Sequence, residues 1–526
     1  MQRRFVVAGV IAVGLTAILL PGTGIGSAAA AAGRGAQTIP AGLARAIHAR
    51  LGAAPVRPVS VAPAHPEFGF DVAVSADGTT ALVGAPGAGK GKGAVYVYHV
   101  ASAGAWNSSS TPVATLTPPA GHGRQAFGGW GMALSADGTT AFVGDPDDHA
   151  VYVFHATSEN AWASSSKPTA TLTATGSDVF GWSLATSADG TTVVVGDPWS
   201  AARVRVYHVA SADAWASTST PTATLSDSVN GLFLSFAVAM SADGTTVLTS
   251  DVGSTGGAAI FHVPDSSAWT SSTTPTAVLT NAGPGDHDSL GGAVGLSGDG
   301  TTAFVGESGV NRKGAVDVFH VAGEALWLSS STPAAILTNG AGATNDYFGE
   351  TLAASTDGKT VVVGAFGAER QKGATSTPAA ELTDSAGVRQ NVPVIQTVRG
   401  DFRSVSASVA IAADGATILF GAPWFNWRMG KAGVFHVADA GSWVTSSTPT
   451  AALPNSALPK PRCVVPQLVG SYVSSAKAEL VNANCSLGKV KRVHSTKKNR
   501  HTVVSQSRAP GRNLPPGSKV NVQIGK

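Results

Sequence analysis

Charged residues and cysteines are both scarce in this chain of 526 residues. Asp, Glu, Lys and Arg together make up 13% of it, and only two cysteines are present, Cys463 and Cys485. Neither cysteine has partners at metal-site spacing, which excludes a cysteine-ligated metal, and the first 462 residues contain no cysteine that could form a disulfide. Glycine is abundant instead, with 63 residues, and favours short strands and turns over long helices.

The few charges are divided unevenly along the chain. From residue 460 to the end there are 13 Lys and Arg residues against a single acid, Glu479, whereas the remainder has 22 basic and 31 acidic residues. A basic C-terminal module is therefore joined to a mildly acidic body.

The N-terminus has the pattern of an export signal. Arg3 and Arg4 precede an apolar run at 5–20, and small residues follow at 27–33, which predicts a signal peptide over residues 1–32. The run is short for a membrane span, although an uncleaved anchor is the alternative. We therefore expect a secreted protein without a transmembrane segment after cleavage, in which Cys463 and Cys485 form a disulfide.

A hairpin of the type Ser-Ala-Asp-Gly recurs seven times. Its aspartates are 52 to 60 residues apart and are Asp77, Asp137, Asp189, Asp243, Asp299, Asp357 and Asp414. Each repeat has four strand-like segments, here called A to D, and this period predicts an all-β fold, a seven-bladed β-propeller of four-stranded blades. Blade six is atypical because it lacks the usual strand C, and we expect residues 392–398 to fill that position.

Two short motifs carry a family resemblance. Phe-Gly opens strand A at Phe68, Phe127, Phe180 and Phe348, and Gly-Ala-Pro follows strand B at Gly84 and Gly421. Residues 64–456 thus resemble the FG-GAP repeats of integrin α-chain heads, which implies the same propeller fold. Some hairpins of that family bind calcium through several aspartates, whereas each hairpin here has a single Asp. We therefore expect no cofactor, with calcium as an alternative that the A–B hairpins do not support.

The lengths of the connections differ between the two ends of the blades. The A–B and C–D links are nearly constant, whereas the spacing across the B–C loop ranges from 11 to 15 residues and that across the D–A loop from 21 to 36. The B–C and D–A loops emerge at the same end of an antiparallel blade. Variable loops on a rigid scaffold favour binding, and integrin heads are similar in using this face, so we expect the ligand there.

Two groups of residues in these loops are candidates for binding. Aromatic and arginine side chains suggest a platform for a sugar ring or a cationic or aromatic partner, unless they pack on neighbouring blades; they are Trp424, Phe425, Trp427, Arg428, Trp199 and Arg203. Acidic turns are weak candidates for a metal, with solvated turns as the alternative; they are Asp145, Asp147, Asp148, Asp286 and Asp288. Six histidines recur at the end of strand C but lie too far apart around a ring to share one ion; they are His99, His155, His208, His262, His320 and His436.

The C-terminal module differs from the repeats. After a linker at 457–462, residues 463–526 have an Ala/Leu stripe typical of a helix, followed by three strand-like segments. With Val465-Pro466, Gly470 and Gly511, this small α+β unit resembles a PASTA domain, which implies peptidoglycan as a partner. Its basic residues can attract anionic wall polymers, or merely keep the domain soluble; they are Lys489, Lys491, Arg492, Lys497, Lys498 and Arg500.

These patterns together predict a secreted, wall-associated binding or adhesion protein that is not an enzyme. Its partners would be peptidoglycan or another glycan, or a protein ligand, and not nucleic acid, because basic residues are not interleaved with aromatic ones. A propeller-based glycosidase or lyase is the alternative, but no conspicuous pair of carboxylates supports it. A purely structural surface protein is a third possibility. Residues 33–63 are expected to add a short helix and a closing strand.

Overall fold

The structure is a computed structural model that describes most of the chain from residue 66 onward. The undescribed positions after that point are 109, 123–125, 177–178, 199–201, 228–233, 252–255, 281–289, 309–313, 339–347, 366–378, 384–388, 396–407, 424–429, 444–448, 454–462, 484, 496–499 and 516. The expected signal peptide and the segment 33–63 therefore lie outside the described residues. Within the described part, no helix is long and apolar enough to cross a membrane.

Seven four-stranded sheets make up the first part of the described chain, and we number them as blades one to seven in chain order. The first three blades consist of β1 (Val72–Val74), β2 (Thr80–Gly84), β3 (Val95–His99) and β4 (Ala114–Leu116); β5 (Met132–Leu134), β6 (Thr140–Asp145), β7 (Ala150–His155) and β8 (Ala170–Thr173); and β9 (Leu184–Thr186), β10 (Thr192–Asp197), β11 (Arg203–His208) and β12 (Ala223–Leu225). The next two consist of β13 (Leu234–Met240), β14 (Thr246–Asp251), β15 (Gly257–His262) and β16 (Ala277–Leu279); and β17 (Leu290–Leu296), β18 (Thr302–Glu307), β19 (Ala315–His320) and β20 (Ala335–Leu337). The last two consist of β21 (Phe348–Ala354), β22 (Val361–Ala365), β23 (Ala379–Thr383) and β24 (Arg389–Ile395); and β25 (Ser408–Ile411), β26 (Thr417–Gly421), β27 (Ala432–His436) and β28 (Ala451–Leu453).

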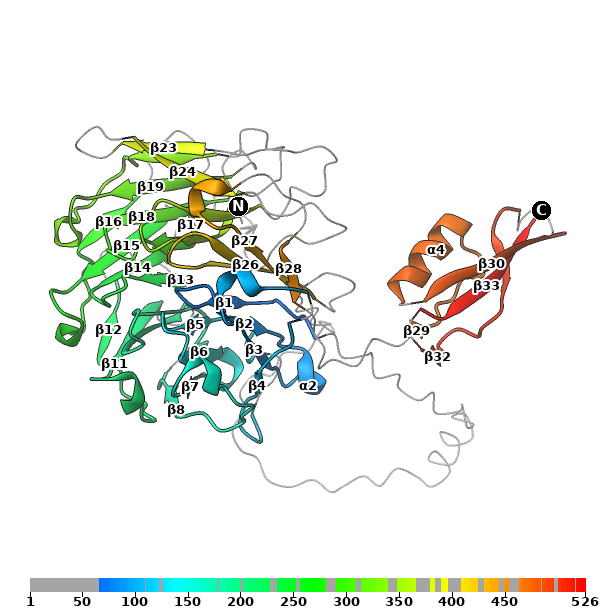
Figure 1. Cartoon of the computed structure of the whole chain (residues 1–526), viewed down its shortest axis with the longest axis horizontal. Helices are drawn as coiled ribbons and strands as arrows, with labels where there is room; N and C mark the ends of the chain where they lie inside the picture. Colours follow the sequence, from blue (N-terminus) through cyan, green and yellow to red (C-terminus); the bar gives the residue numbers. More distant parts are fainter. Residues whose placement is uncertain are drawn as a thin grey trace, which may run out of the picture. The chain divides into compact units, whose positions relative to one another are not determined.

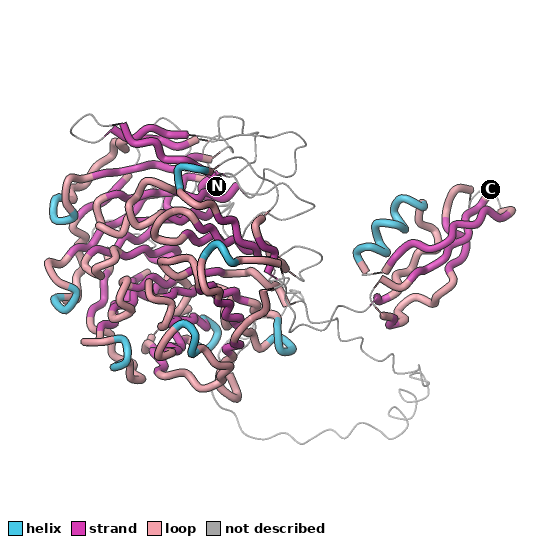
Figure 2. Tube along the Cα trace, in the orientation of Figure 1, coloured by secondary structure: helices cyan, strands magenta, loops and turns pink. Residues whose placement is uncertain are grey.

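Helical segments in the propeller are short and scattered among strands and loops (Figure 2). They are α2 (Ala88–Gly91), η1 (Ala103–Ala105), η2 (Pro146–Asp148), η3 (Glu159–Ala161), η4 (Ala212–Ala214), η5 (Ser266–Ala268), η7 (Glu324–Leu326) and η9 (Ala440–Ser442). Six of these lie in the C–D links, one in each of blades one to five and one in blade seven. The all-β class predicted from the repeats is confirmed.

Blade six has a different strand order from the others. Its sheet runs β21-β22-β24-β23, and β24 pairs parallel to β22, whereas neighbouring strands in the other blades are antiparallel and in chain order. The third position is thus filled by residues 389–395, which follow β23 in the chain and overlap the segment expected there. A parallel strand in this position has to arrive from a longer connection than a hairpin allows.

Each A–B hairpin is a tight turn stabilised by its aspartate. In blade one, Asp77 accepts hydrogen bonds from the hydroxyl of Ser75 (2.7 Å) and the backbone N–H of Thr79 (2.9 Å), while Gly78 has a φ of 71°. Burial opposes ionisation of Asp77, but these hydrogen bonds outweigh it and lower the pKa of the carboxyl. The repeated aspartate is therefore a turn residue, and the carboxylate is already used within its own hairpin.

Adjacent hairpins are joined by backbone hydrogen bonds that form a closed cycle. Ala76 donates to the carbonyl of Ala136, and the same bond repeats from each hairpin to the next until Ala413 donates back to Ala76. The full sequence of donors is Ala76, Ala136, Ala188, Ala242, Gly298, Thr356 and Ala413. Blade seven therefore bonds to blade one in the way that every other blade bonds to its neighbour.

Blades one and seven also share a hydrophobic core. Phe68, Val83 and Tyr96 of blade one pack in one buried cluster with Leu419 and Val434 of blade seven. In Figure 1 the blue strand β1 accordingly lies beside β26. The approach between blades is close enough to require glycine, because a β-carbon on Gly84 would collide with the carbonyl oxygen of Gly128 in the next blade.

The tryptophan of each C–D link ties that link to the hairpin of its own blade. Trp215 is 5% exposed, and its indole N–H donates to the carbonyl of Gly190 at 2.9 Å. The other five bonds are Trp106 to Gly78, Trp162 to Gly138, Trp269 to Gly244, Trp327 to Gly300 and Trp443 to Gly415. The repeated histidines have a similar structural partner, since the Nδ1 of each lies 2.9–3.0 Å from a threonine hydroxyl at the start of strand B.

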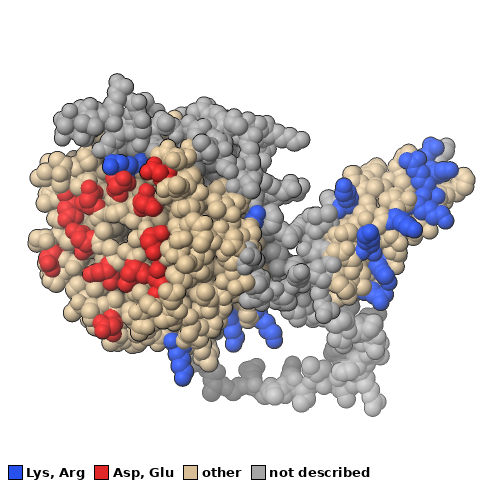
Figure 3. All heavy atoms as spheres, viewed as in Figure 1, with Lys and Arg blue, Asp and Glu red and all other residues tan. Residues whose placement is uncertain are grey.

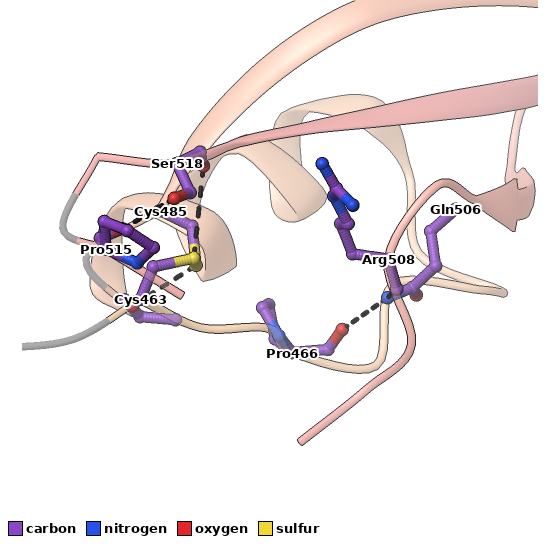
Figure 4. The surroundings of a disulfide bond; sticks show 8 residues. Cys463, Pro466, Cys485, Gln506, Arg508, Pro515 and Ser518 are labelled. Carbon is purple, nitrogen blue, oxygen red and sulfur yellow. Dashed lines mark hydrogen bonds between the residues drawn. A yellow bond between two sulfur atoms is a disulfide. The ribbon is translucent and has the colours of Figure 1, made fainter. Parts of the chain in front are cut away.

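The C-terminal domain is an α+β unit. It consists of β29 (Cys463–Val464), α4 (Val473–Asn482), β30 (Ser486–Val493), β31 (Val503–Gln506), β32 (Asn513–Leu514) and β33 (Lys519–Gly525). The main sheet has the order β30-β33-β31, and Ala476 and Leu480 of α4 pack in its core. The expected disulfide between Cys463 and Cys485 is present (Figure 4). Near it, Gln506 donates to the carbonyl of Pro466 at 2.9 Å, which ties the start of the domain to β31.

Candidate ligand-binding sites

Most of the loop residues predicted to bind a ligand lie outside the described residues. These are Trp424, Phe425, Trp427, Arg428, Trp199, Asp286, Asp288, Lys497 and Lys498. Arg203 is described: it begins β11, faces Asp197 in the ladder, and its buried Nε makes no hydrogen bond. It lies at the end of the blade from which the B–C loop emerges.

An aromatic belt that sequence reasoning missed lies at this same end of the blades. It consists of Phe70, Trp130, Trp182 and Phe236, one from each of blades one to four, all half-buried. Trp130 stacks on Trp182 with ring centroids 4.1 Å apart, Phe70 contacts Trp130 at 5.5 Å, and Phe236 contacts Trp182 at 6.1 Å. The four rings thus form one continuous row across four blades.

The belt lies at the start of the innermost strands of the ring: Phe70, Trp130 and Trp182 come two residues before β1, β5 and β9, and Phe236 lies within β13. Strand A of each blade contacts strand A of the next, as β1 does with β5 and β25. Each belt residue is five positions before the serine of its A–B hairpin, which is Ser75 in the case of Phe70. The backbone N–H of Phe70 bonds to the carbonyl of Gly84, where β2 ends. The belt is therefore next to the axis, at the end from which the B–C and D–A loops emerge.

Two carboxyl groups lie at the same level, Glu350 within β21 and Asp71 directly before β1. Glu350 occupies the belt position of blade six, and burial raises its pKa to about 7. Asp71 follows Phe70 and accepts a hydrogen bond from the hydroxyl of Ser408 in blade seven at 2.7 Å. Burial raises the pKa of Asp71 to about 6, although hydrogen bonds from Ser408 and Val72 partly oppose it. Near neutral pH these carboxyls can both donate and accept hydrogen bonds.

This combination suits a ligand with both an apolar face and hydroxyl groups. Half-buried aromatic rings offer edges and faces for packing, and carboxyls recognise hydroxyls through hydrogen bonds. The signal in the sequence was the position five residues before each hairpin serine, which holds Phe, Trp, Trp and Phe in four successive repeats and Glu in blade six. These residues were read only as parts of strand A.

The acidic turn of blade two is fully described. Asp145 ends β6 and is buried, whereas Asp147 is exposed and Asp148 lies in η2 with its carboxylate 3.3 Å from Nδ1 of His122. No group of three or more His, Cys, Asp or Glu side chains is arranged as a metal site in the part of the chain that the structure describes. The turn therefore brings together two of the predicted acids and adds a histidine.

The opposite end of the propeller carries the aspartates of the A–B hairpins, all of which are exposed. Figure 3 shows acidic side chains around the centre of one face of the propeller, with few basic ones among them. The exposed carboxylates make this end of the propeller electrostatically negative. It is also structurally uniform, because each carboxylate accepts hydrogen bonds within its own turn.

The described basic residues of the C-terminal domain lie on its surface. Lys489, Lys491 and Arg492 are exposed on β30, which is an edge strand of the sheet, and Arg500 is exposed beyond it. Basic side chains on an edge strand oppose pairing with another strand and leave a positive strip for an anionic ligand. Figure 3 shows Lys and Arg side chains as the charged groups visible on this domain.

Comparison with known proteins separates the two parts of the chain. The PASTA domain matches residues 464–526, and the FG-GAP repeat matches residues 60–98 and 332–380. No curated protein sequence matches. Solved structures of similar fold include hydrazine synthase of Kuenenia stuttgartiensis (14% identity, TM-score 0.45, covering 73% of this chain and 99% of that one).

Two further similar structures are those of U3-55K and of the RRP9 WD40 repeats. Each is 14% identical with a TM-score of 0.42; they cover 68% and 69% of this chain and 88% and 90% of their own. The motifs, the blades and the matched families agree with one another, so this chain carries FG-GAP repeats in a β-propeller and ends in a PASTA domain, a combination that fits a surface or cell-wall-binding protein.

Proposed function

We propose that the protein is exported, attaches to the cell wall through its PASTA domain, and uses the B–C/D–A face of its propeller to bind a glycan without catalysing a reaction. The observation that carries this proposal is the pairing of a PASTA domain, with its exposed basic strand, and a propeller with an aromatic belt at the axis. Among alternatives, an enzyme acting on polysaccharide would need two carboxylates in reacting geometry. Asp71 already accepts a hydrogen bond from Ser408 of blade seven, which favours a role in holding the two blades together over a catalytic role.

Wall attachment predicts that reversing the charge of β30 will release the protein. In a pull-down of the full chain on purified cell walls, the triple variant Lys489→Glu, Lys491→Glu, Arg492→Glu should bind roughly tenfold less than the wild type, because three attractive charges become repulsive. Wild-type binding should also fall as salt rises from low to high concentration. The control is Lys167→Glu, an exposed lysine of the propeller. Undiminished binding of the triple variant would contradict attachment through this strand.

Glycan binding at the belt predicts a selective effect of tryptophan removal. On a glycan array, Trp130→Ala and Trp182→Ala should each lose roughly tenfold in signal, the upper end of what one aromatic contact contributes. Leu328→Ala removes a side chain that is 77% exposed and should have no effect. Thermal unfolding of each variant identifies any loss caused by misfolding. If both folded single variants bind glycans as the wild type does, the belt is not the ligand site.

A further inference from the structure

The buried carboxylate of Asp145 in blade two lacks the charge partner that blade three provides at the same position. Asp145 and Asp197 each end the second strand of their blade, directly after Gly144 and Gly196. In blade three, Arg205 of the adjacent strand places its guanidinium 3.3 Å from the Asp197 carboxylate. The ladder position of Arg205, opposite Val195, is taken in blade two by Tyr152, opposite Val143. Blade two therefore keeps the anion and has a neutral phenol where blade three has a cation.

The surroundings of Asp145 make its charge unfavourable. Its side chain is fully buried, and neither carboxylate oxygen makes a hydrogen bond of normal geometry. Burial, the carboxylates of Asp148 and Asp147, and the proximity of the Asp148 side chain as a hydrogen-bond partner raise the pKa of Asp145 to about 7, and the backbone N–H of Asp148 opposes this rise. A buried carboxylate with two unused oxygens and acidic neighbours has a strong electrostatic preference for a cation.

The second acid of the turn is held in place and reaches the surface. The hydroxyl of Tyr152 hydrogen-bonds Asp148, and Nδ1 of His122 lies 3.3 Å from its carboxylate, whose side chain is 15% exposed. Asp148 thus connects the buried Asp145 to solvent. The pair of acids therefore has one buried member and one that is partly exposed to solvent.

We propose that Asp145 and Asp148 together bind a calcium ion in the B–C turn of blade two. Calcium accepts both oxygens of one carboxylate and completes its coordination with main-chain oxygens and water, whereas magnesium requires near-ideal octahedral geometry. The two carboxylate oxygens of Asp145, which are buried without a hydrogen-bond partner, suit this two-oxygen coordination of calcium. The site is at the opposite end of the blade from the A–B hairpins, whose aspartates bind their own turns, and it does not depend on the proposed glycan function. Two carboxylates supplemented by water imply an affinity in the millimolar range typical of extracellular modules.

The test measures thermal unfolding of the full chain in three conditions: in EDTA, in calcium chloride and in magnesium chloride. Millimolar calcium should raise the melting temperature of the wild type by a few degrees, and magnesium should not. Terbium should bind in competition with calcium and give luminescence on excitation of the nearby Tyr152. Asp145→Asn should abolish both responses and should melt higher than the wild type in EDTA, because a neutral amide replaces a buried carboxylate.

A second variant copies the solution of blade three. Tyr152→Arg supplies the guanidinium internally and should also remove the calcium response. The matched control is Asp197→Asn in blade three, which should be less stable but should keep the full response. A wild type that does not respond to calcium, or an Asp145→Asn variant that responds like the wild type, overturns the proposal. The second outcome would assign calcium binding to exposed carboxylates such as those of the hairpins.

Discussion

Trp215→Ala should destabilise the propeller by about 4 kcal/mol, the middle of the range for truncating a buried tryptophan. The side chain is 5% exposed, donates a hydrogen bond to Gly190 of its own hairpin, and packs edge-on against Phe142 of blade two at 5.3 Å between centroids. Truncation therefore loosens a hairpin and opens a cavity between two blades. Urea unfolding of the full chain, followed by the change in tryptophan fluorescence and circular dichroism, measures the effect.

Two variants separate the causes of this loss. Trp215→Phe retains most of the buried ring and loses the hydrogen bond to Gly190, which should leave a smaller deficit of about 1–2 kcal/mol. Leu328→Ala, at a side chain that is 77% exposed, should change stability by less than about 0.5 kcal/mol. If Trp215→Ala were as mild as Leu328→Ala, the repeated tryptophans would not be structural links between hairpin and blade.

Arg205→Met should destabilise the protein by about 3 kcal/mol, because it removes a buried cation and leaves its anion behind. The Arg205 and Asp197 side chains are only 6% and 1% exposed, and the guanidinium also bonds to the carbonyl of Thr175 and lies over the ring of Phe180. The low end of the usual range applies because Arg203 faces Asp197 in the ladder. The same urea titration measures this change.

The double variant Asp197→Asn, Arg205→Met tests whether charge is the cause. Removing both ions leaves no uncompensated charge, so the double variant should recover most of the stability that Arg205→Met loses. A double variant as unstable as the single one would show that the contacts of the arginine with Thr175 and Phe180, rather than its charge, stabilise blade three.

The repeat pattern was sufficient to predict the fold, because the blades are built from local rules. Asp-Gly turns, buried second strands and Trp at a fixed distance recur in the sequence, and each has a local physical cause in the structure. Blade six shows where such rules stop: a parallel third strand is a nonlocal pairing that no turn motif encodes. The segment that fills it was recognisable only because the usual strand was absent.

The binding residues were harder to predict than the fold for a different reason. Phe70 and Phe236 share one position relative to their hairpin serines, but only the packing of successive blades brings the rings at this position into one row, and that packing is not visible within a single repeat. The contrast between Asp145 and Asp197 was hidden for the same reason, since the residue that distinguishes them lies on the next strand. Asp145 and Asp148, the two acids that lie together in the acidic turn of blade two, were nevertheless among the residues predicted as weak metal candidates.

The cycle of hairpin hydrogen bonds has one junction unlike the other six. Between consecutive blades the chain itself keeps the two partners close, so a broken contact reforms with little loss of entropy. Between blades seven and one the partners are separated by more than 300 residues, as in the bond from Ala413 to Ala76, and rejoining them requires closure of a very long loop. The interface between blades seven and one is therefore where we expect the propeller to open first under heat or force.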